Sequence, residues 1–240
     1  MKIKFDFSPN FSTKKRLSKD IKFVIIHYTG MQSAIESLNR LKNPKKKVSC
    51  HYIIERNGKV TQMVKDKFIA WHAGKSKWKN FVNLNRYSIG VELVNKGHRF
   101  SYQKFKEKQI KSLIYVCKFL KKKYKIDTSN FLGHSDIAPL RKSDPGEKFP
   151  WKKLSLHKLG IWFKPKKNIR KFLIKNKRVF FFKNLKKLGY RYFKISKKNP
   201  KDKKIIRAFQ QHYFPQRVSG KIDLKTMEIS HFLANRRKIS

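Results

Sequence analysis

The sequence predicts a three-layer α/β domain followed by a small all-α domain of three helices. Two observations lead to this fold class. Up to residue 151, short apolar runs typical of strands alternate with segments of helical periodicity. Beyond that point the sequence becomes lysine-rich, and three short amphipathic helical patterns follow at 179–190, 201–214 and 224–237.

The first elements expected are a buried strand and a short helix. Residues 22–30 read KFVIIHYTG, a continuous apolar run closed by a glycine, which predicts a buried strand. Ser33 and Glu36 have the spacing of a capping box. The helix that they begin is expected to end at Asn43-Pro44, because proline cannot continue it.

A hairpin and a second strand are expected next. Residues 51–64 contain two strand-like runs around Asn57-Gly58, a strong signal for a tight β-turn. Apolar residues alternate with other types in residues 87–94. This alternation predicts a strand with Glu92 on the face opposite the apolar side chains.

A longer helix and a last strand complete the α/β domain. Apolar residues recur at helical spacing between residues 103 and 124, with lysines on the opposite face. The segment 131–136, FLGHSD, predicts a short strand that runs into a long loop. The lysine-rich, proline-containing segment 152–170 is expected to be a tether.

These elements divide the chain into four parts. We expect an N-terminal extension at 1–20, the α/β domain at 21–163, a linker at 164–178 and the three-helix domain at 179–237. The length of 240 residues fits one domain of ordinary size with a small companion.

Composition excludes several classes of protein. The chain is 39% hydrophobic, which argues against a disordered basic tail. No apolar stretch approaches the roughly 18 residues of a transmembrane helix. The first residues lack the apolar segment of a secretion signal, which favours a cytoplasmic location over a periplasmic or wall-associated one. Two cysteines are too few for a disulfide framework or a Cys-rich zinc site.

The net charge of +48 invites a nucleic-acid partner, because lysine and arginine bind phosphate backbones. However, the charge runs through both halves of the chain and is mostly lysine, whereas readout of base edges favours arginine. We therefore expect no specific nucleic-acid partner. AT-rich coding bias accounts for much of the lysine, and attraction to some polyanion is a secondary consequence.

Three residues at turn or strand ends could bind a metal ion: His27, His134 and Asp144. Two neutral imidazoles and one carboxylate leave an open fourth position on a tetrahedral zinc ion, as in catalytic sites. Glu92 is the candidate proton acceptor, and Lys142 could stabilise a developing oxyanion. Spacing alone leaves other choices open, because eight histidines allow many triplets.

Five motifs make the sequence recognisable. They are VIIHYTG (24–30), VSCHYIIERNGKV (48–60), AWHAGKSKW (70–78), LNRYSIGVELVN (84–95) and GHSDIAPLRKSDPGEKFPW (133–151). On these residues the chain, over about 21–163, resembles the zinc-dependent N-acetylmuramoyl-L-alanine amidases of the type 2 family, especially the AmiD/AmpD-like group. This family shares its fold with the peptidoglycan recognition proteins.

The resemblance implies a fold, an activity and a set of roles. It implies a mixed central β-sheet flanked by helices, one zinc ion bound by His27, His134 and Asp144, and Glu92 and Lys142 as the catalytic pair. The family cleaves the amide between the lactyl group of N-acetylmuramic acid, or its anhydro form, and the L-alanine of the stem peptide. The implied partners are peptidoglycan or muropeptides during turnover, recycling or remodelling, and we expect a monomer.

The C-terminal part is similar to a peptidoglycan-binding domain of the three-helix type. The similarity lies in AFQQHYF (208–214) and SGKIDLKT (219–226). Asp223 stands where that pattern usually has a second glycine. This departure argues against wall binding by the domain alone and favours packing against the amidase domain.

Four further residues are candidates for substrate binding: Tyr28, His72, Asn85 and Arg86. Tyr28 and His72 could equally have packing or structural roles, whereas Asn85 and Arg86 could hold carboxylates of a muramyl peptide. His51 is expected to be a buried hydrogen-bond partner. The histidines outside the motifs are expected to be surface or packing residues: His98, His157, His212 and His231.

Two other functions remain open on the sequence. A peptidoglycan recognition protein binds muropeptide on the same fold without cutting it. Such proteins commonly lack a zinc ligand, and none is missing here. A nucleic-acid-binding protein would depend on charge alone and predicts selective binding with a steep salt dependence.

Overall fold

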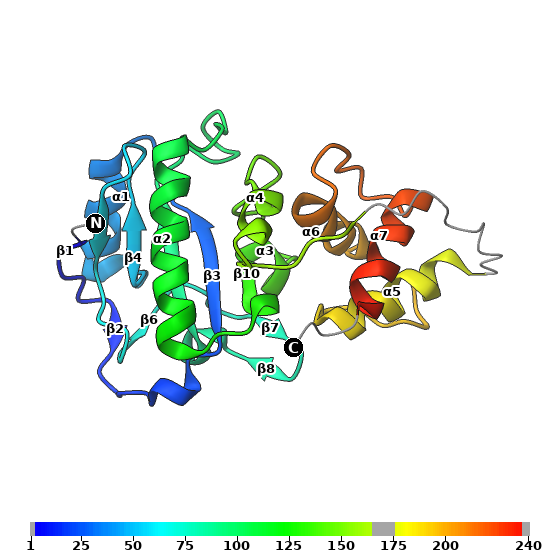
Figure 1. Cartoon of the computed structure of the whole chain (residues 1–240), viewed down its shortest axis with the longest axis horizontal. Coiled ribbons are helices and arrows are strands. Elements are labelled where there is room, and N and C mark those ends of the chain that lie inside the picture. Colours follow the sequence, from blue (N-terminus) through cyan, green and yellow to red (C-terminus); the bar gives the residue numbers. More distant parts are fainter. Residues whose placement is uncertain (1–2, 165–175, 237–240) are drawn as a thin grey trace.

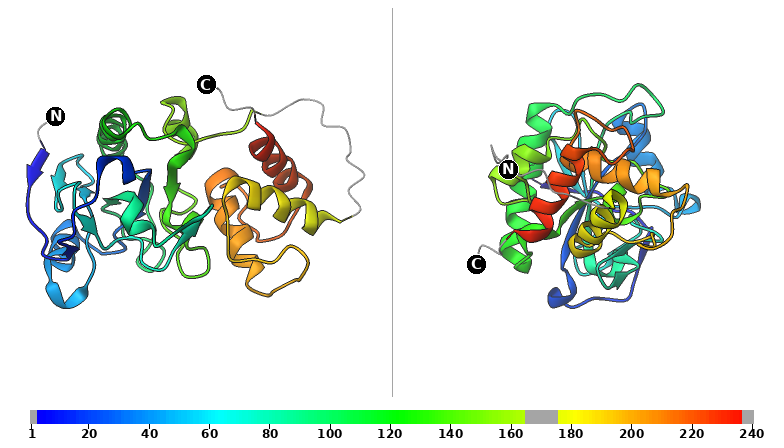
Figure 2. Two further views of the ribbon diagram at one scale, coloured as in Figure 1. Left: turned by 90° about the horizontal axis from the view of Figure 1, so that it is seen from below. Right: turned by 90° about the vertical axis from the view of Figure 1, so that its right-hand side faces the viewer.

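The computed structural model describes residues 3–164 and 176–236. Figure 1 shows an α/β part, which contains the strands and helices α1 to α4, beside three C-terminal helices, α5 to α7. In the left view of Figure 2 these three helices lie at the end of the molecule opposite the blue N-terminal strand. The predicted fold class, an α/β domain followed by three helices, is therefore confirmed.

A six-stranded sheet forms the centre of the α/β part, in the order β1-β5-β4-β9-β3-β10. Strands β4 and β5 are antiparallel and the other neighbours are parallel, so the sheet is mixed, as predicted. Two small sheets pair β2 with β6 and β7 with β8. The strands are β1 (Ile3–Phe5), β2 (Phe11–Ser12), β3 (Phe23–Tyr28), β4 (Tyr52–Ile54), β5 (Val60–Gln62), β6 (Ile69–Ala70), β7 (Lys77–Trp78), β8 (Phe81–Val82), β9 (Ser88–Leu93) and β10 (Phe131–Gly133).

Helices cover the sheet and make up the C-terminal part. Among the described residues they are α1 (Ala34–Lys42), α2 (Glu107–Tyr124), α3 (His134–Ile137), α4 (Trp151–Leu156), α5 (Lys177–Leu188), α6 (Asp202–Tyr213) and α7 (Leu224–Asn235). Short 3-10 helices occur at η1 (Ser18–Asp20), η2 (Pro44–Lys46), η3 (Leu84–Tyr87) and η4 (Thr128–Asn130).

Both faces of the sheet are buried. Successive residues of a strand point to opposite sides, so two neighbours on β3 report on the two faces. Val24 of β3 lies in one apolar cluster with Leu113 of α2. Its neighbour Ile25 lies in a second cluster with Phe181 of α5 and Phe209 of α6. The C-terminal helices therefore share a core with the sheet instead of standing apart from it.

Local signals in the sequence predicted several elements correctly. The run at 22–30 forms β3, and the turn at Asn57-Gly58 joins the antiparallel strands β4 and β5. The side-chain oxygen of Ser33 accepts a hydrogen bond from the backbone N–H of Glu36 at 3.1 Å, and this cap begins α1. These elements depend on neighbouring residues, which is why the sequence alone identified them.

Two of the predicted segments contain regular elements that the sequence did not indicate. The proposed N-terminal extension at 1–20 contains β1, which pairs in parallel with β5 at the sheet edge through backbone groups that carry no sequence signal. The proposed tether at 152–170 overlaps α4, whose Leu154 is buried in the core beside the sheet. Within the proposed linker at 164–178, residues 165–175 lie outside the described residues.

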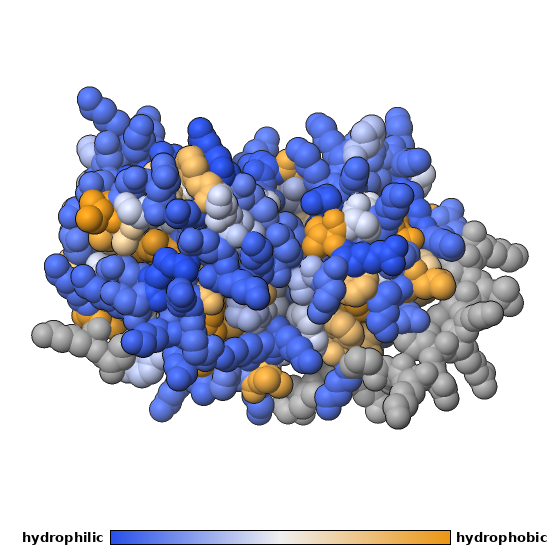
Figure 3. Space-filling view, turned by 90° about the horizontal axis from the view of Figure 1, so that it is seen from above, coloured by the Kyte–Doolittle hydropathy of each residue, from blue (hydrophilic) through white to orange (hydrophobic). Residues whose placement is uncertain are grey.

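The face drawn in Figure 3 is mainly hydrophilic, and its apolar residues form small separate patches. The many lysine side chains thus lie on the surface, and the core is mainly apolar. None of the helices in the described part of the chain combines the length and hydropathy that a membrane span requires.

Candidate metal and catalytic centre

Two neighbouring parallel strands bring the candidate histidine ligands together. His27 is near the end of β3, and His134 is the first residue of α3, directly after β10. Gly133 of β10 is opposite Ile26 of β3 in the sheet, so the next residue on each strand is His134 and His27. The carboxyl ends of parallel strands meet at one edge of a sheet, where ligands commonly bind. Asp144 reaches the same point from the loop that follows α3.

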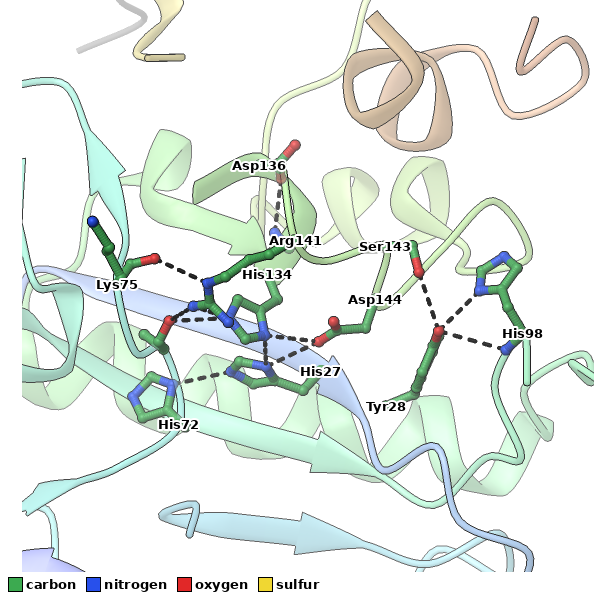
Figure 4. Close-up of polar contacts among 12 residues, drawn as sticks. His27, Tyr28, His72, Lys75, His98, His134, Asp136, Arg141, Ser143 and Asp144 are labelled. Atoms are coloured by element: carbon green, nitrogen blue, oxygen red, sulfur yellow. Dashed lines mark hydrogen bonds and ion pairs between the residues drawn. The ribbon is translucent and has the colours of Figure 1, made fainter. Parts of the chain in front are cut away.

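The three side chains converge on a small buried volume (Figure 4). The Nδ1 atoms of His27 and His134 are 2.9 Å apart, and each lies 3.1 Å from Oδ2 of Asp144. Burial, helped by the charge of His134, lowers the pKa of His27 to about 4. Burial opposes ionisation of Asp144, but the two imidazoles outweigh it and hold the pKa of this carboxyl far below its usual range.

The donor atoms fit a metal ion. Nε2 of His134 lies 3.1 Å from the backbone carbonyl of Ala73, which can only accept a hydrogen bond. The Arg141 guanidinium, a donor, also lies 3.2 Å from this Nε2, but the acceptor carbonyl is nearer and favours the proton of a neutral His134 ring on Nε2. Nδ1 then presents a lone pair toward the Asp144 carboxylate. Two acceptors at this distance repel each other unless a cation lies between them. Two imidazole nitrogens and one carboxylate oxygen are also donor types that zinc prefers.

Glu92 lies one strand away from these residues. It is directly opposite His27 in the parallel pair of β3 and β9, and its side chain is only 9% exposed. Its Oε2 is buried and has no hydrogen-bond partner in the described part of the chain. Burial, together with the charge of Asp144, raises the pKa of Glu92 to about 8, while Lys142 acts in the opposite direction. Such a carboxyl is well suited to accept and release a proton near neutral pH.

Lys142 lies two residues before Asp144, on the loop after α3 that we call the ligand loop, and it is exposed. Its backbone N–H donates to the carbonyl of Ala138 at 3.1 Å, which fixes the turn that carries it. Its charge lowers the pKa of both Glu92 and His27. The ammonium group therefore acts electrostatically on the centre from its solvent side.

The candidate substrate-binding residues occupy different places. Tyr28 is half-buried, and its hydroxyl lies 2.9 Å from Nδ1 of His98 and 3.3 Å from the hydroxyl of Ser143 (Figure 4). His98 also lies 3.0 Å from a carboxylate oxygen of Glu147. This cluster sits beside the ligand loop and faces solvent, so Tyr28 stays a candidate for substrate contact.

The other three candidates for substrate binding are placed less favourably for contact with a substrate. His72 is buried, with Nδ1 3.0 Å from Nε2 of His27. The side-chain oxygen of Asn85 accepts hydrogen bonds from the backbone N–H groups of His72 and Ala73, at 3.1 and 2.6 Å. Arg86 is exposed at the end of η3. The structure therefore brings His72 to His27 from inside the protein, while Asn85 holds the backbone of His72 and Ala73.

Sequence reasoning missed several groups around the centre. Arg141 donates to the carbonyls of Lys75 and Ala73 and lies 3.2 Å from Nε2 of His134. His98, expected to be an ordinary residue, contacts Tyr28. Arg141 was within reach, since it stands in the same motif as Lys142. The carbonyl of Ala73 carries no sequence signal at all.

The family model and the relatives that match this chain are all described as muramyl-L-alanine amidases. A family model described as N-acetylmuramoyl-L-alanine amidase matches residues 17–147. The N-acetylmuramoyl-L-alanine amidase AmiD of Escherichia coli K12 is 33% identical over 234 residues, which cover 89% of this chain and 82% of that protein. The 1,6-anhydro-N-acetylmuramyl-L-alanine amidase AmpD of Haemophilus influenzae is 34% identical over 164 residues, which cover 61% and 86%.

Solved structures extend the similarity to the C-terminal helices. The complex of E. coli AmiD with anhydro-N-acetylmuramic acid-L-Ala-D-gamma-Glu-L-Lys has a TM-score of 0.77 at 30% identity, covering 89% of this chain and 88% of that one. AmpDh3 from Pseudomonas aeruginosa in complex with anhydromuramic pentapeptide has a TM-score of 0.79 at 27% identity, covering 94% and 95%. Coverage of this extent includes most of the C-terminal helices.

Proposed function

Because this chain belongs to the N-acetylmuramoyl-L-alanine amidase family, we propose that His27, His134 and Asp144 bind one zinc ion for amide hydrolysis. The chain is an N-acetylmuramoyl-L-alanine amidase, which cleaves the bond between the lactyl group of the muramic acid and the L-alanine of the stem peptide. The observation that carries the zinc proposal is the convergence of three buried donor atoms beside the unpaired carboxyl of Glu92.

The residues of the centre have separable roles in this proposal. His27, His134 and Asp144 would hold the zinc ion, which when bound would supply a Lewis acid for the scissile carbonyl and would lower the pKa of a water molecule from about 15.7 to near 7. Glu92 accepts a proton from the attacking water and delivers it to the nitrogen of the leaving L-alanine. Lys142 places a positive charge near the carbonyl oxygen as it becomes negative. The carbonyl carbon gains a bond to the water oxygen and loses its bond to nitrogen.

We propose that the substrate carries a 1,6-anhydro sugar. Both complexes that resemble this chain across its length hold an anhydromuramic peptide. A clear test compares purified protein on small anhydro-muropeptides, on the corresponding N-acetylmuramic acid peptides and on intact sacculi. Preference for small anhydro-muropeptides would fit recycling in the cytoplasm, whereas release of peptides from sacculi would fit action at the wall.

We also propose that the chain acts as a monomer. All candidate ligands, the candidate proton acceptor and Lys142 come from one chain. Sedimentation of the zinc-loaded protein at working concentration should therefore give a single species with the mass of one chain, 28.8 kDa.

The role of Glu92 can be tested against a matched carboxylate. We expect Glu92→Gln to lower kcat/KM by about 100-fold or more while zinc content stays at one ion per chain. Glu55→Gln is the control, because Glu55 is a partly buried carboxylate that pairs with the exposed Lys59, 3.5 Å away, and should be near wild type. A folded, zinc-loaded Glu92→Gln protein with full activity would contradict the mechanism. Chelation should abolish wild-type activity and added Zn²⁺ should restore it.

A further inference from the structure

Two consecutive residues contact the outer nitrogen atoms of both candidate histidine ligands. Nδ1 of His72 lies 3.0 Å from Nε2 of His27 (Figure 4). The carbonyl oxygen of Ala73 lies 3.1 Å from Nε2 of His134. We propose that this dipeptide fixes both ligand rings with Nδ1 unprotonated and aimed at the metal, and that His72 is a positioning residue held by Ser88. The inference rests on the proposed function, since it assumes that the three ligands bind zinc.

Hydrogen-bond directions along one chain of groups fix the state of His27. The hydroxyl of Ser88 donates to the carbonyl of Leu84 at 2.6 Å, so its oxygen is left to accept from Nε2 of His72 at 3.2 Å. His72 then carries its proton on Nε2 and has a lone pair on Nδ1. That lone pair accepts from Nε2–H of His27. A neutral His27 therefore has its free lone pair on Nδ1, the atom that faces His134 and Asp144.

The second ligand is held in the same state by simpler means. A backbone carbonyl accepts only, and the Ala73 carbonyl is the nearer of the two groups at Nε2, at 3.1 Å against 3.2 Å for the donor Arg141, so this contact favours the proton of His134 on Nε2. Arg141 donates to the same carbonyl and so helps to hold it in place. Both ligands consequently present the same nitrogen atom to the centre, although their rings lie on different elements, β3 and α3.

The supporting dipeptide is itself fixed from two sides. Asn85 binds both of its backbone N–H groups through one side-chain oxygen. On the other side the His72 ring packs directly on Gly90 of β9, where a Cβ atom would lie only 2.3 Å from Cγ of His72. The backbone of Gly90 does not have a positive φ, so glycine is required there for the close approach of this ring. Such packing leaves the imidazole little freedom to turn.

Partners of this kind orient ligands, and their loss typically lowers metal affinity by about 10–100-fold. Without the acceptor on His72, His27 can take the tautomer with its proton on Nδ1 and can rotate. Without the hydroxyl of Ser88, His72 can change to the tautomer with its proton on Nδ1. That proton would then point at the proton on Nε2 of His27. The expected effect is therefore larger for loss of His72 than for loss of Ser88.

The test measures zinc affinity by competition with a chromophoric chelator, and circular dichroism checks the fold of each variant. We expect His72→Ala to bind zinc about 10–100-fold more weakly and Ser88→Ala to be intermediate. His72→Asn should recover part of the affinity, because its side-chain oxygen can accept from His27. Ser76→Ala is the control: Ser76 is also buried and bonds to Gly74 and Leu84, yet touches neither ligand.

Kinetics of the zinc-saturated variants separate positioning from substrate contact. Positioning predicts a lower kcat with KM within about threefold of wild type. Unchanged zinc affinity in folded His72→Ala and Ser88→Ala proteins, or a raised KM with unchanged affinity, would overturn the inference. If His72→Ala does not fold, Ser88→Ala and His72→Asn decide the question against Ser76→Ala. A wild-type protein that binds no zinc would instead refute the proposed function.

Discussion

At the scale of single residues, burial determines the chemistry of the centre. Glu92 stands on the strand next to His27 with an unpaired oxygen, and desolvation shifts its pKa to about 8. The sequence identified Glu92 because a carboxylate on an apolar strand is costly without a function. It could not give the shift, because the shift depends on the depth of burial and on the charge of Asp144, which is distant in sequence.

The raised pKa of Glu92 predicts a pH-dependent stability of the metal-free protein. Folding favours the neutral carboxyl, so stability falls as pH rises from about 4.5, where the unfolded group ionises, through about 8, where the folded group does. Glu92→Gln removes this loss. Thermal unfolding should therefore show a larger gain from the substitution near pH 8.5 than near pH 5, by on the order of 3 kcal/mol. An equal gain at both pH values would contradict the shift.

At the scale of elements, the order of strands creates the site. Periodicity predicted β3, β9 and β10 as separate strands, but only their parallel adjacency places His27, Glu92 and His134 side by side. His27 and His134 are 107 residues apart in sequence. The family resemblance implied that both histidines belong to one site, whereas spacing alone could not have selected them among eight histidines.

The short ligand helix α3 is also tied to the C-terminal helices. Asp136 of α3 accepts hydrogen bonds from the hydroxyl of Tyr190 and from Nδ1 of His212, the latter at 2.7 Å. The His212 ring is stacked between Trp151 and Tyr213, with centroids 3.9 Å from each. His212, which we expected to be a surface or packing residue, is thus a buried packing residue at the contact between α3 and α6.

This contact predicts a difference between two tyrosines. Tyr190→Phe removes a hydrogen bond to a buried carboxylate and should lower the free energy of unfolding by about 1–3 kcal/mol. Tyr192→Phe is the matched control, because the buried Tyr192 hydroxyl has no partner in the part of the chain that the structure describes. We expect it to change stability by less than about 0.5 kcal/mol. Urea unfolding measures both, and equal effects would refute the proposed role of the Tyr190 hydroxyl.

At the scale of the whole molecule, one apolar cluster joins the two parts of the chain. It contains Phe23 and Leu132 from the sheet together with Phe182, Ile205 and Leu233 from the C-terminal helices. Packing against the amidase domain was the expectation drawn from Asp223, and the structure confirms it. That the C-terminal helices do not bind peptidoglycan on their own stays a prediction.

The shared core predicts a single unfolding transition. A large apolar interface couples two domains, because separating them exposes the core of both. Thermal unfolding followed by far-UV circular dichroism and by tryptophan fluorescence should give coincident curves in the metal-free protein. Two resolved transitions would show that the C-terminal helices fold as an independent unit.

The net charge of +48 predicts a salt effect that depends on substrate size. Peptidoglycan stem peptides are rich in carboxylates, and a lysine-covered surface attracts an extended polyanion at many points. Raising ionic strength from about 0.05 to 0.5 M should weaken sacculus binding by roughly tenfold or more, because it screens these contacts. Turnover of a small muropeptide should change by less than about threefold. Equal salt sensitivity of both would contradict a role for the overall charge.

The sequence by itself identified the side chains that we propose to carry the chemistry, and it predicted the central strands and the longer helices. Those properties reside in residue type and in short-range periodicity, which a linear sequence contains. Only the tertiary structure decided that His72 and the carbonyl of Ala73 contact the two candidate histidine ligands and that Asp136 links α3 to the C-terminal helices. A backbone carbonyl has no identity in the sequence, and burial arises only when residues distant along the chain pack together.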